Sequence, residues 1–134
     1  MNAFIICSLK SLADDYDKLI WVRSNLLIKK YSIAEDWINY RLDIVDSKPK
    51  FKHTSGFDYM KVAIDQITNS DLIIIFLTVP STYVTTLLKY STYLNKKIIL
   101  LYRSKKLIDK INLNLSENIT PIQVKSIKQL IKYL

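Results

Sequence analysis

Hydroxyl and cationic side chains follow two apolar runs of the chain, at residues 3–7 and 72–77, and five of them are candidate phosphate- or nucleotide-binding residues: Ser8, Lys10, Ser81, Thr82 and Tyr83. The chain contains a single glycine, Gly56, which excludes the glycine-rich phosphate cradles of dinucleotide and P-loop sites. A phosphate would therefore be held by hydroxyls, by cations and by the free amides at the start of a helix.

Four carboxylates are candidates for acid–base chemistry: Glu35, Asp36, Asp58 and Asp65. A carboxylate close to a bound substrate can give or take a proton in the transition state. Adjacent residues of a strand point to opposite faces, so Glu35 and Asp36 are not expected to face one site together. The chain has one cysteine, Cys7, and one histidine, His53, which cannot assemble an ordinary metal site. We expect neither a metal nor a cofactor.

A strand–helix–strand unit is predicted to position the second group of candidate residues. Leu72–Leu77 is six consecutive apolar residues, which is typical of a strand buried on both faces, and Ile98–Tyr102 is a second such run. Between them apolar residues recur at helical spacing, with Ser81 or Thr82 as N-cap and Asn95 in the left-handed conformation at the C-terminus. Such crossovers join parallel strands, and ligands lie at the carboxyl ends of those strands.

The rest of the chain continues this alternation of strands and helices. The expected elements are a strand at Ala3–Cys7, a helix that begins with a capping box at Ser11 and runs to Lys30, a short second strand within Tyr31–Ile38, a helix from Ser55 to Asn69, a helix at Lys105–Ile111, a strand at Ile119–Val124 and an amphipathic helix to Leu134. This alternation predicts an α/β fold in one domain, residues 1–134. Leu72–Leu77 is expected to be central, between the other two apolar runs.

The bulk properties favour an intracellular protein with anionic partners. The single cysteine forms no internal disulfide, and neither a basic, apolar leader nor an apolar stretch of about 20 residues is present, so we expect a cytoplasmic protein. The net charge is +8, and residues 96–134 hold nine Lys and Arg against Asp109 and Glu117. Such a balance suits nucleotides or nucleic acid. Solvated lysines on terminal helices explain it equally well.

The segment from Thr78 to Arg103 resembles the 2′-deoxynucleoside 5′-phosphate N-hydrolases, relatives of the nucleoside 2-deoxyribosyltransferases. The residues that carry the resemblance are Thr78-Val79-Pro80-Ser81, the helix that follows, Asn95-Lys96-Lys97 and Leu101-Tyr102-Arg103. The resemblance implies a Rossmann-like (flavodoxin-like) three-layer sandwich with a five-stranded parallel sheet in the order 2-1-3-4-5. It also implies a homodimer and a nucleoside 5′-phosphate as the ligand.

The resemblance extends to the binding residues but not to the catalytic ones. Ser8 and Lys10 fall on a serine and an arginine that contact the substrate's 5′-phosphate in that family. The catalytic glutamate of the family falls on Leu87, an acidic residue that faces the sugar falls on Ala63, and a glycine falls on Tyr83. The phosphate-binding half of the site is thus retained, whereas both carboxylates are replaced by apolar side chains.

Three hypotheses follow. The protein is a catalytically inactive relative that binds a nucleotide or a protein partner, or it is an active N-glycoside hydrolase or deoxyribosyltransferase with a relocated carboxylate, or it is an interaction module, similar to a TIR adaptor, with a vestigial pocket. The relocated carboxylate would be one of the four named above. In the first case Ser8, Lys10 and Ser81 are expected to converge on one anion at the carboxyl ends of neighbouring strands.

Overall fold

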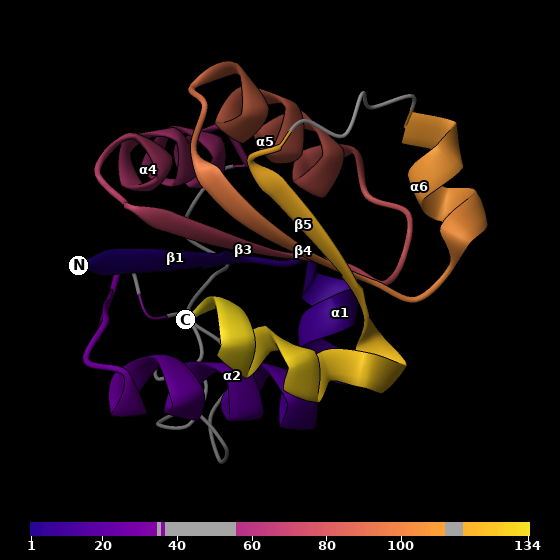
Figure 1. Cartoon of the computed structure of the whole chain (residues 1–134). Coiled ribbons are helices and arrows are strands. Elements are labelled where there is room, and N and C mark those ends of the chain that lie inside the picture. The colour runs from indigo at the N-terminus through magenta and orange to yellow at the C-terminus, as the bar shows by residue number, and fades with distance from the viewer. Residues whose placement is uncertain (35, 37–55, 112–116) are drawn as a thin grey trace, which may run out of the picture.

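The computed structural model describes residues 1–34, 36, 56–111 and 117–134, which form one central sheet between two layers of helices (Figure 1). The strands are β1 (Asn2–Ile6), β2 (Ser32–Ile33), β3 (Leu72–Leu77), β4 (Lys97–Tyr102) and β5 (Ile119–Gln123). Every neighbouring pair is parallel, and the order is β2-β1-β3-β4-β5. The predicted fold class and strand order are confirmed, with β3 at the centre.

Helices cover both faces of this sheet. One face carries α1 (Leu9–Asp14), α2 (Tyr16–Ile28) and the 3₁₀ helix η2 (Val124–Tyr133), and the other carries α4 (Gly56–Thr68), α5 (Thr82–Tyr93) and α6 (Lys105–Ile111), as Figure 1 shows. The helix predicted at Lys105–Ile111 is confirmed, as are Ser81 as the N-cap of α5 and the left-handed Asn95, whose φ is 56°. In the described residues no helix is both long and apolar enough to span a membrane.

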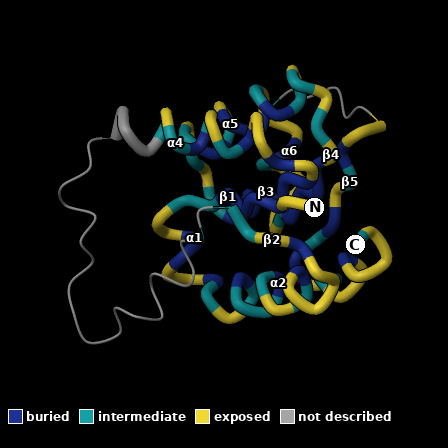
Figure 2. The backbone as a smooth tube through the Cα atoms, turned by 90° about the vertical axis from the view of Figure 1, so that its left-hand side faces the viewer, coloured by how far each residue is buried: buried dark blue, intermediate teal, exposed yellow. Residues whose placement is uncertain are grey.

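The core lies on both sides of β3, all of whose residues are buried. Leu72, Ile74 and Phe76 belong to the apolar cluster under α2 and η2, and the alternate residues belong to the cluster under α4 and α5. Figure 2 shows the result as a dark-blue sheet between helices whose outer faces are exposed. Burial on both faces is the reason that this strand is an unbroken apolar run.

The first helix differs from the prediction, because two helices replace one. Ser8, not Ser11, is the N-cap, since the Ser8 side chain accepts a hydrogen bond from the Ser11 amide at 3.1 Å. Ser11 is instead a buried residue of α1. The chain leaves the helical conformation at Asp15, with φ −115° and ψ 25°, and α2 begins at the next residue. The break therefore lies at the residue whose carboxylate accepts hydrogen bonds from Thr78 and Arg103.

The C-terminal segment also differs, because it is a 3₁₀ helix that already begins at Val124, which was assigned to the last strand. A 3₁₀ helix has three residues per turn, so residues three apart share a face. Ile127 is partly buried and Leu130 is buried on one face, beyond a break in the helical conformation at Ser126, whereas Ile131 is 42% exposed. The predicted helical stripe is therefore only partly correct.

The second predicted strand is confirmed as short and at the edge of the sheet, where β2 contributes two residues. Tyr31, which was expected to open it, precedes β2 and is buried. The capping residue predicted at Ser55 and the histidine at position 53 lie outside the described residues.

Candidate functional site

The carboxyl ends of β1, β3 and β4 meet at one edge of the sheet. Ile6 pairs in register with Ile75, and Leu77 pairs with Tyr102, so the residues that follow these strands are neighbours in space. Polar side chains occupy this edge after each strand: Ser8 after β1, Thr78 after β3 and Arg103 after β4. The fold thus gathers polar groups where ligands of open parallel sheets bind.

A continuous chain of hydrogen bonds connects these loops. The Ser8 hydroxyl donates to Ser11 Oγ at 3.1 Å, Ser11 Oγ lies 2.7 Å from Thr78 Oγ1, and Thr78 Oγ1 donates to Asp15 Oδ2 at 2.7 Å. Because Thr78 has one hydroxyl proton and gives it to Asp15, Ser11 is the donor to Thr78. Arg103 Nη2 donates to the other carboxylate oxygen at 2.5 Å. We call these five residues the Asp15 network.

Asp15 is the only charged side chain in the buried set of the described residues, at 1% exposure. Lys18 Nζ lies 3.7 Å from Asp15 Oδ1, so two cations face the same carboxylate. Burial by itself raises the pKa of Asp15, but the hydrogen bonds from Thr78 and Arg103 and the charges of Arg103 and Lys18 outweigh it. The pKa lies below its ordinary value, and the carboxylate is ionised at neutral pH.

The lowered pKa of Asp15 predicts a loss of stability in acid. A carboxyl with a lower pKa in the folded state than in the unfolded state contributes stability above its unfolded pKa, which is 3.8 here, and loses it as pH falls towards the folded pKa. We expect the free energy of unfolding in urea to decline below about pH 4 more steeply for the wild type than for Asp15→Asn. An identical decline in both proteins would contradict this assignment.

The structure places the predicted phosphate-binding residues in three different settings. Ser8 and Ser81 are both helix N-caps, and the Ser81 side chain accepts from the Val84 amide at 3.2 Å. Lys10 in α1 and Thr82 at the start of α5 are exposed. Tyr83 is half-buried and packs against the apolar cluster under α4 and α5. Among the described contacts no hydrogen bond joins Ser8 to Ser81, so convergence of the trio on one anion stays a prediction.

The predicted carboxylates are not gathered into one site by the described residues. Asp36 forms an ion pair with Arg23, whose Nε donates to both carboxylate oxygens at 3.0 and 2.8 Å and whose Nη2 lies 2.8 Å from Oδ2. This hydrogen bond raises the pKa of Arg23. Asp65 is exposed on α4. Glu35 and the side chain of Asp58 lie outside the described part of the chain.

The two positions that the resemblance assigns to carboxylates are deeply apolar. Leu87 in α5 and Ala63 in α4 are both 0% exposed and belong to the cluster that also contains Phe4 and Ile6. An ionised carboxylate in such surroundings would need a charged or hydrogen-bonding partner. The side chains at these positions pack the sheet against its helices.

Sequence reasoning missed the centre of the Asp15 network. Asp15 was not among the candidate carboxylates, and Ser11 was interpreted as the start of a capping box. One signal was present, because Asp15 falls at helical spacing between Leu12 and Leu19, on the stripe that proves to be buried. In the described residues no three His, Cys, Asp or Glu side chains lie where they could hold a metal ion.

Comparison with known protein families and with curated proteins gives no match. Among solved structures, the chain is similar to the CMP N-glycosidase BcmB of Clostridium botulinum, with a TM-score of 0.67 and 22% sequence identity, over 100% of both chains. This likeness shows the fold alone, and that fold is the one that the resemblance of the segment from Thr78 to Arg103 implied.

Proposed function

We propose that this protein binds a nucleoside 5′-monophosphate and does not cleave its N-glycosidic bond. The observation that carries the proposal is the burial of Leu87 and Ala63 at 0% exposure, at the two positions to which the resemblance assigns the family's carboxylates. The likeness of the whole fold to a CMP N-glycosidase supports the nucleotide as the ligand.

Cleavage of an N-glycosidic bond requires groups that these positions do not supply. A carboxylate stabilises the oxocarbenium-like transition state, and a second acid assists the leaving base. Leu87 and Ala63 can do neither. Of the four candidate carboxylates, the two with described side chains are engaged or exposed: Asp36 is bound by Arg23, and Asp65 is exposed on α4. The buried Asp15 is bound by Thr78 and Arg103. Removing a catalytic nucleophile costs on the order of 10⁴-fold or more in rate.

Binding of the phosphate requires only groups that the chain retains. Ser8 follows β1, Lys10 is exposed two residues further on in α1, and Ser81 caps the twelve-residue helix α5. Free amides at a helix N-terminus and the helix dipole both favour a phosphate. For such an open site we expect a dissociation constant between micromolar and millimolar, roughly −8 to −4 kcal/mol.

Calorimetric titration with the common nucleoside 5′-monophosphates and with the matching nucleosides tests this proposal. The monophosphates should bind and the nucleosides should bind more weakly, because the phosphate provides most of the attraction. Lys10→Ala should weaken binding about tenfold, the loss of one charge-assisted hydrogen bond. Tyr83→Gly should strengthen it if the ring occupies the position of the sugar.

Lys29→Ala is the matched control, because Lys29 is exposed beyond the end of α2, towards the opposite edge of the sheet, and its removal should leave binding unchanged. If the wild type, Lys10→Ala and Tyr83→Gly all give no heat with any nucleotide, the proposal fails. The interaction-module hypothesis then takes its place.

The proposal includes a cytoplasmic homodimer, which the resemblance implies. Light scattering during size-exclusion chromatography should give about twice the chain mass of 15.7 kDa. A monomer mass at micromolar concentration would remove the dimer from the proposal without affecting nucleotide binding. The net charge of +8 does not by itself call for nucleic acid as a partner, because solvated lysines on the terminal helices also explain it.

A further inference from the structure

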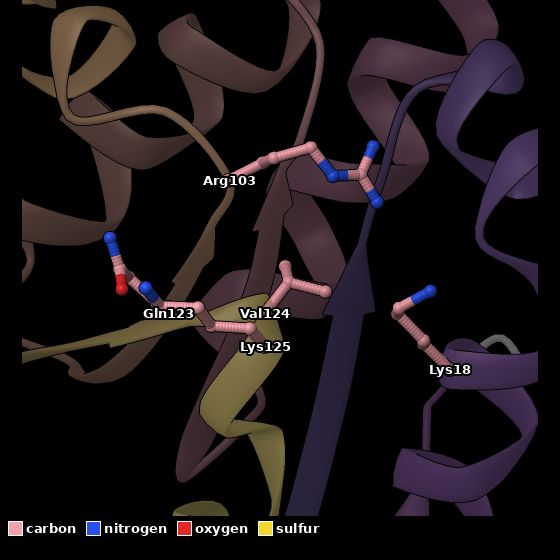
Figure 3. A pocket seen from close by; sticks show the side chains of 5 residues that line it. All are labelled: Lys18, Arg103, Gln123, Val124 and Lys125. Carbon is pink, nitrogen blue, oxygen red and sulfur yellow. The ribbon is translucent and has the colours of Figure 1, made fainter.

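A pocket of about 290 Å³ adjoins the Asp15 network on the side of β4 and β5 (Figure 3). It is lined by Lys18, Arg103, Gln123, Val124 and Lys125. Arg103 directly follows β4, the residues from 123 to 125 join β5 to η2, and Lys18 lies in the first turn of α2. None of the residues assigned above to the nucleotide phosphate lines this pocket.

The pocket is strongly cationic. Three of the lining side chains carry a positive charge. The carboxylate of Asp15 contacts two of them, Lys18 and Arg103, and its single negative charge leaves two formal positive charges. Figure 3 shows the side chains of Arg103 and Lys18 reaching into the same region from different elements, Arg103 from the end of β4 and Lys18 from α2. Asp15 Oδ1 lies 2.5 Å from Arg103 Nη2 and 3.7 Å from Lys18 Nζ. Like charges held this close attract an anion.

The lining also provides hydrogen-bond donors that can face a ligand. Arg103 employs Nη2 for Asp15, and its guanidinium plane carries further N–H groups in the fork geometry that matches two phosphate oxygens. In the part of the chain that the structure describes, the side chains of Gln123 and Lys125 have no recorded hydrogen bond or ion pair. Val124, 4% exposed, contributes an apolar wall.

The volume limits the size of the ligand. Small-molecule sites usually start near 300 Å³, so this pocket suits a phosphate with a small attached group. We propose that it binds the phosphate group of a small phosphomonoester, between the cations of Lys18, Arg103 and Lys125. This second anion site lies beyond the proposed nucleotide site and shares no residue with it.

Amide NMR titration with inorganic phosphate and with glycerol 3-phosphate tests this site directly. We expect saturable shift changes at Arg103 and at residues 123–125, with tighter binding of glycerol 3-phosphate than of inorganic phosphate. Lys125→Glu should weaken binding at least about tenfold, because it replaces an attractive charge by a repulsive one. Lys128→Glu makes the same change of charge at an exposed position of the same helix, and should weaken it less than about twofold.

Equal effects of Lys125→Glu and Lys128→Glu would overturn the proposal, since general attraction to a basic surface would then explain the binding. Shifts confined to Ser8, Lys10 and Ser81 would overturn it as well, and would assign the phosphate to the nucleotide site. Lys10→Ala separates the two sites: glycerol 3-phosphate should bind this variant as it binds the wild type, whereas nucleotide affinity should fall. Either site can therefore fail without the other.

Discussion

Ile74→Ala should lower the free energy of unfolding by about 2–5 kcal/mol, the usual range for truncating a buried aliphatic residue to alanine. Ile74 is 0% exposed in the middle of β3. It lies in register with Ile5 on one side and with Ile99 on the other, and all three belong to the cluster under α2 and η2. Three rigid, hydrogen-bonded strands cannot move together to fill the space that the lost carbons leave.

Urea unfolding followed by circular dichroism measures this effect. Ile28→Ala is the matched control, because Ile28 ends α2 with 73% of its surface exposed, and the same truncation there should change stability by no more than about 0.5 kcal/mol. A loss below about 1 kcal/mol for Ile74→Ala would mean that β3 is not the centre of the core.

Asp15→Ala should lower the free energy of unfolding by about 3 kcal/mol, because it removes the carboxylate that accepts the hydrogen bonds at the end of the Asp15 network. Thr78 and Ser11 are buried. The Thr78 hydroxyl, to which Ser11 is hydrogen-bonded, would lose its charged acceptor and would gain no water in its place. Arg103 would lose its partner as well, but its side chain is 48% exposed and can be hydrated. The cost should therefore come mainly from the hydroxyl side of the network.

Asp14→Ala provides the comparison, since it removes an exposed carboxylate one residue earlier and should change stability by no more than about 0.5 kcal/mol. Thr78→Val, which removes the donor and keeps the shape, should reproduce part of the loss seen with Asp15→Ala. If Asp15→Ala and Asp14→Ala were equally stable, the Asp15 network would have no structural role.

The fold could be predicted from the sequence because its central strands are unbroken apolar runs. Leu72–Leu77 and the run from Ile98 contain no polar residue that could face water, and only a strand covered on both faces requires such a sequence. The strand order was implied by the resemblance of the segment from Thr78 to Arg103 to a family with that order.

The break between α1 and α2 could not be predicted in the same way. The spacing of apolar residues favoured one continuous helix. Thr78, which donates a hydrogen bond to Asp15 at the break, is 63 residues away along the chain. The 3₁₀ form of η2 was not predicted either. Apolar residues three apart suit both an α-helix and a 3₁₀ helix, and the contacts of Val124 and Leu130 with the core are made with residues distant in the sequence.

The sequence predicted the edge of the sheet at which polar side chains gather, but not which of them meet there. The predicted edge of the sheet, at the carboxyl ends of β1 and β3, does hold a polar cluster, but its members are mainly Ser11, Asp15, Thr78 and Arg103. Sequence spacing cannot show that Arg103 meets Asp15, because the two lie 88 positions apart. Ser8 is the one residue that belongs both to the predicted phosphate-binding group and to this network.

A single ¹H NMR experiment tests most directly whether the protein binds nucleotides without cleaving them. In it the protein is mixed with each nucleoside 5′-monophosphate in turn. Saturation transfer from the protein to the nucleotide reports binding, and the signals of the free base report cleavage in the same tube. We expect transfer to at least one monophosphate and release of base below about 0.01 per second, far under ordinary enzyme rates. Faster release, or no transfer to any monophosphate, would contradict the proposed function.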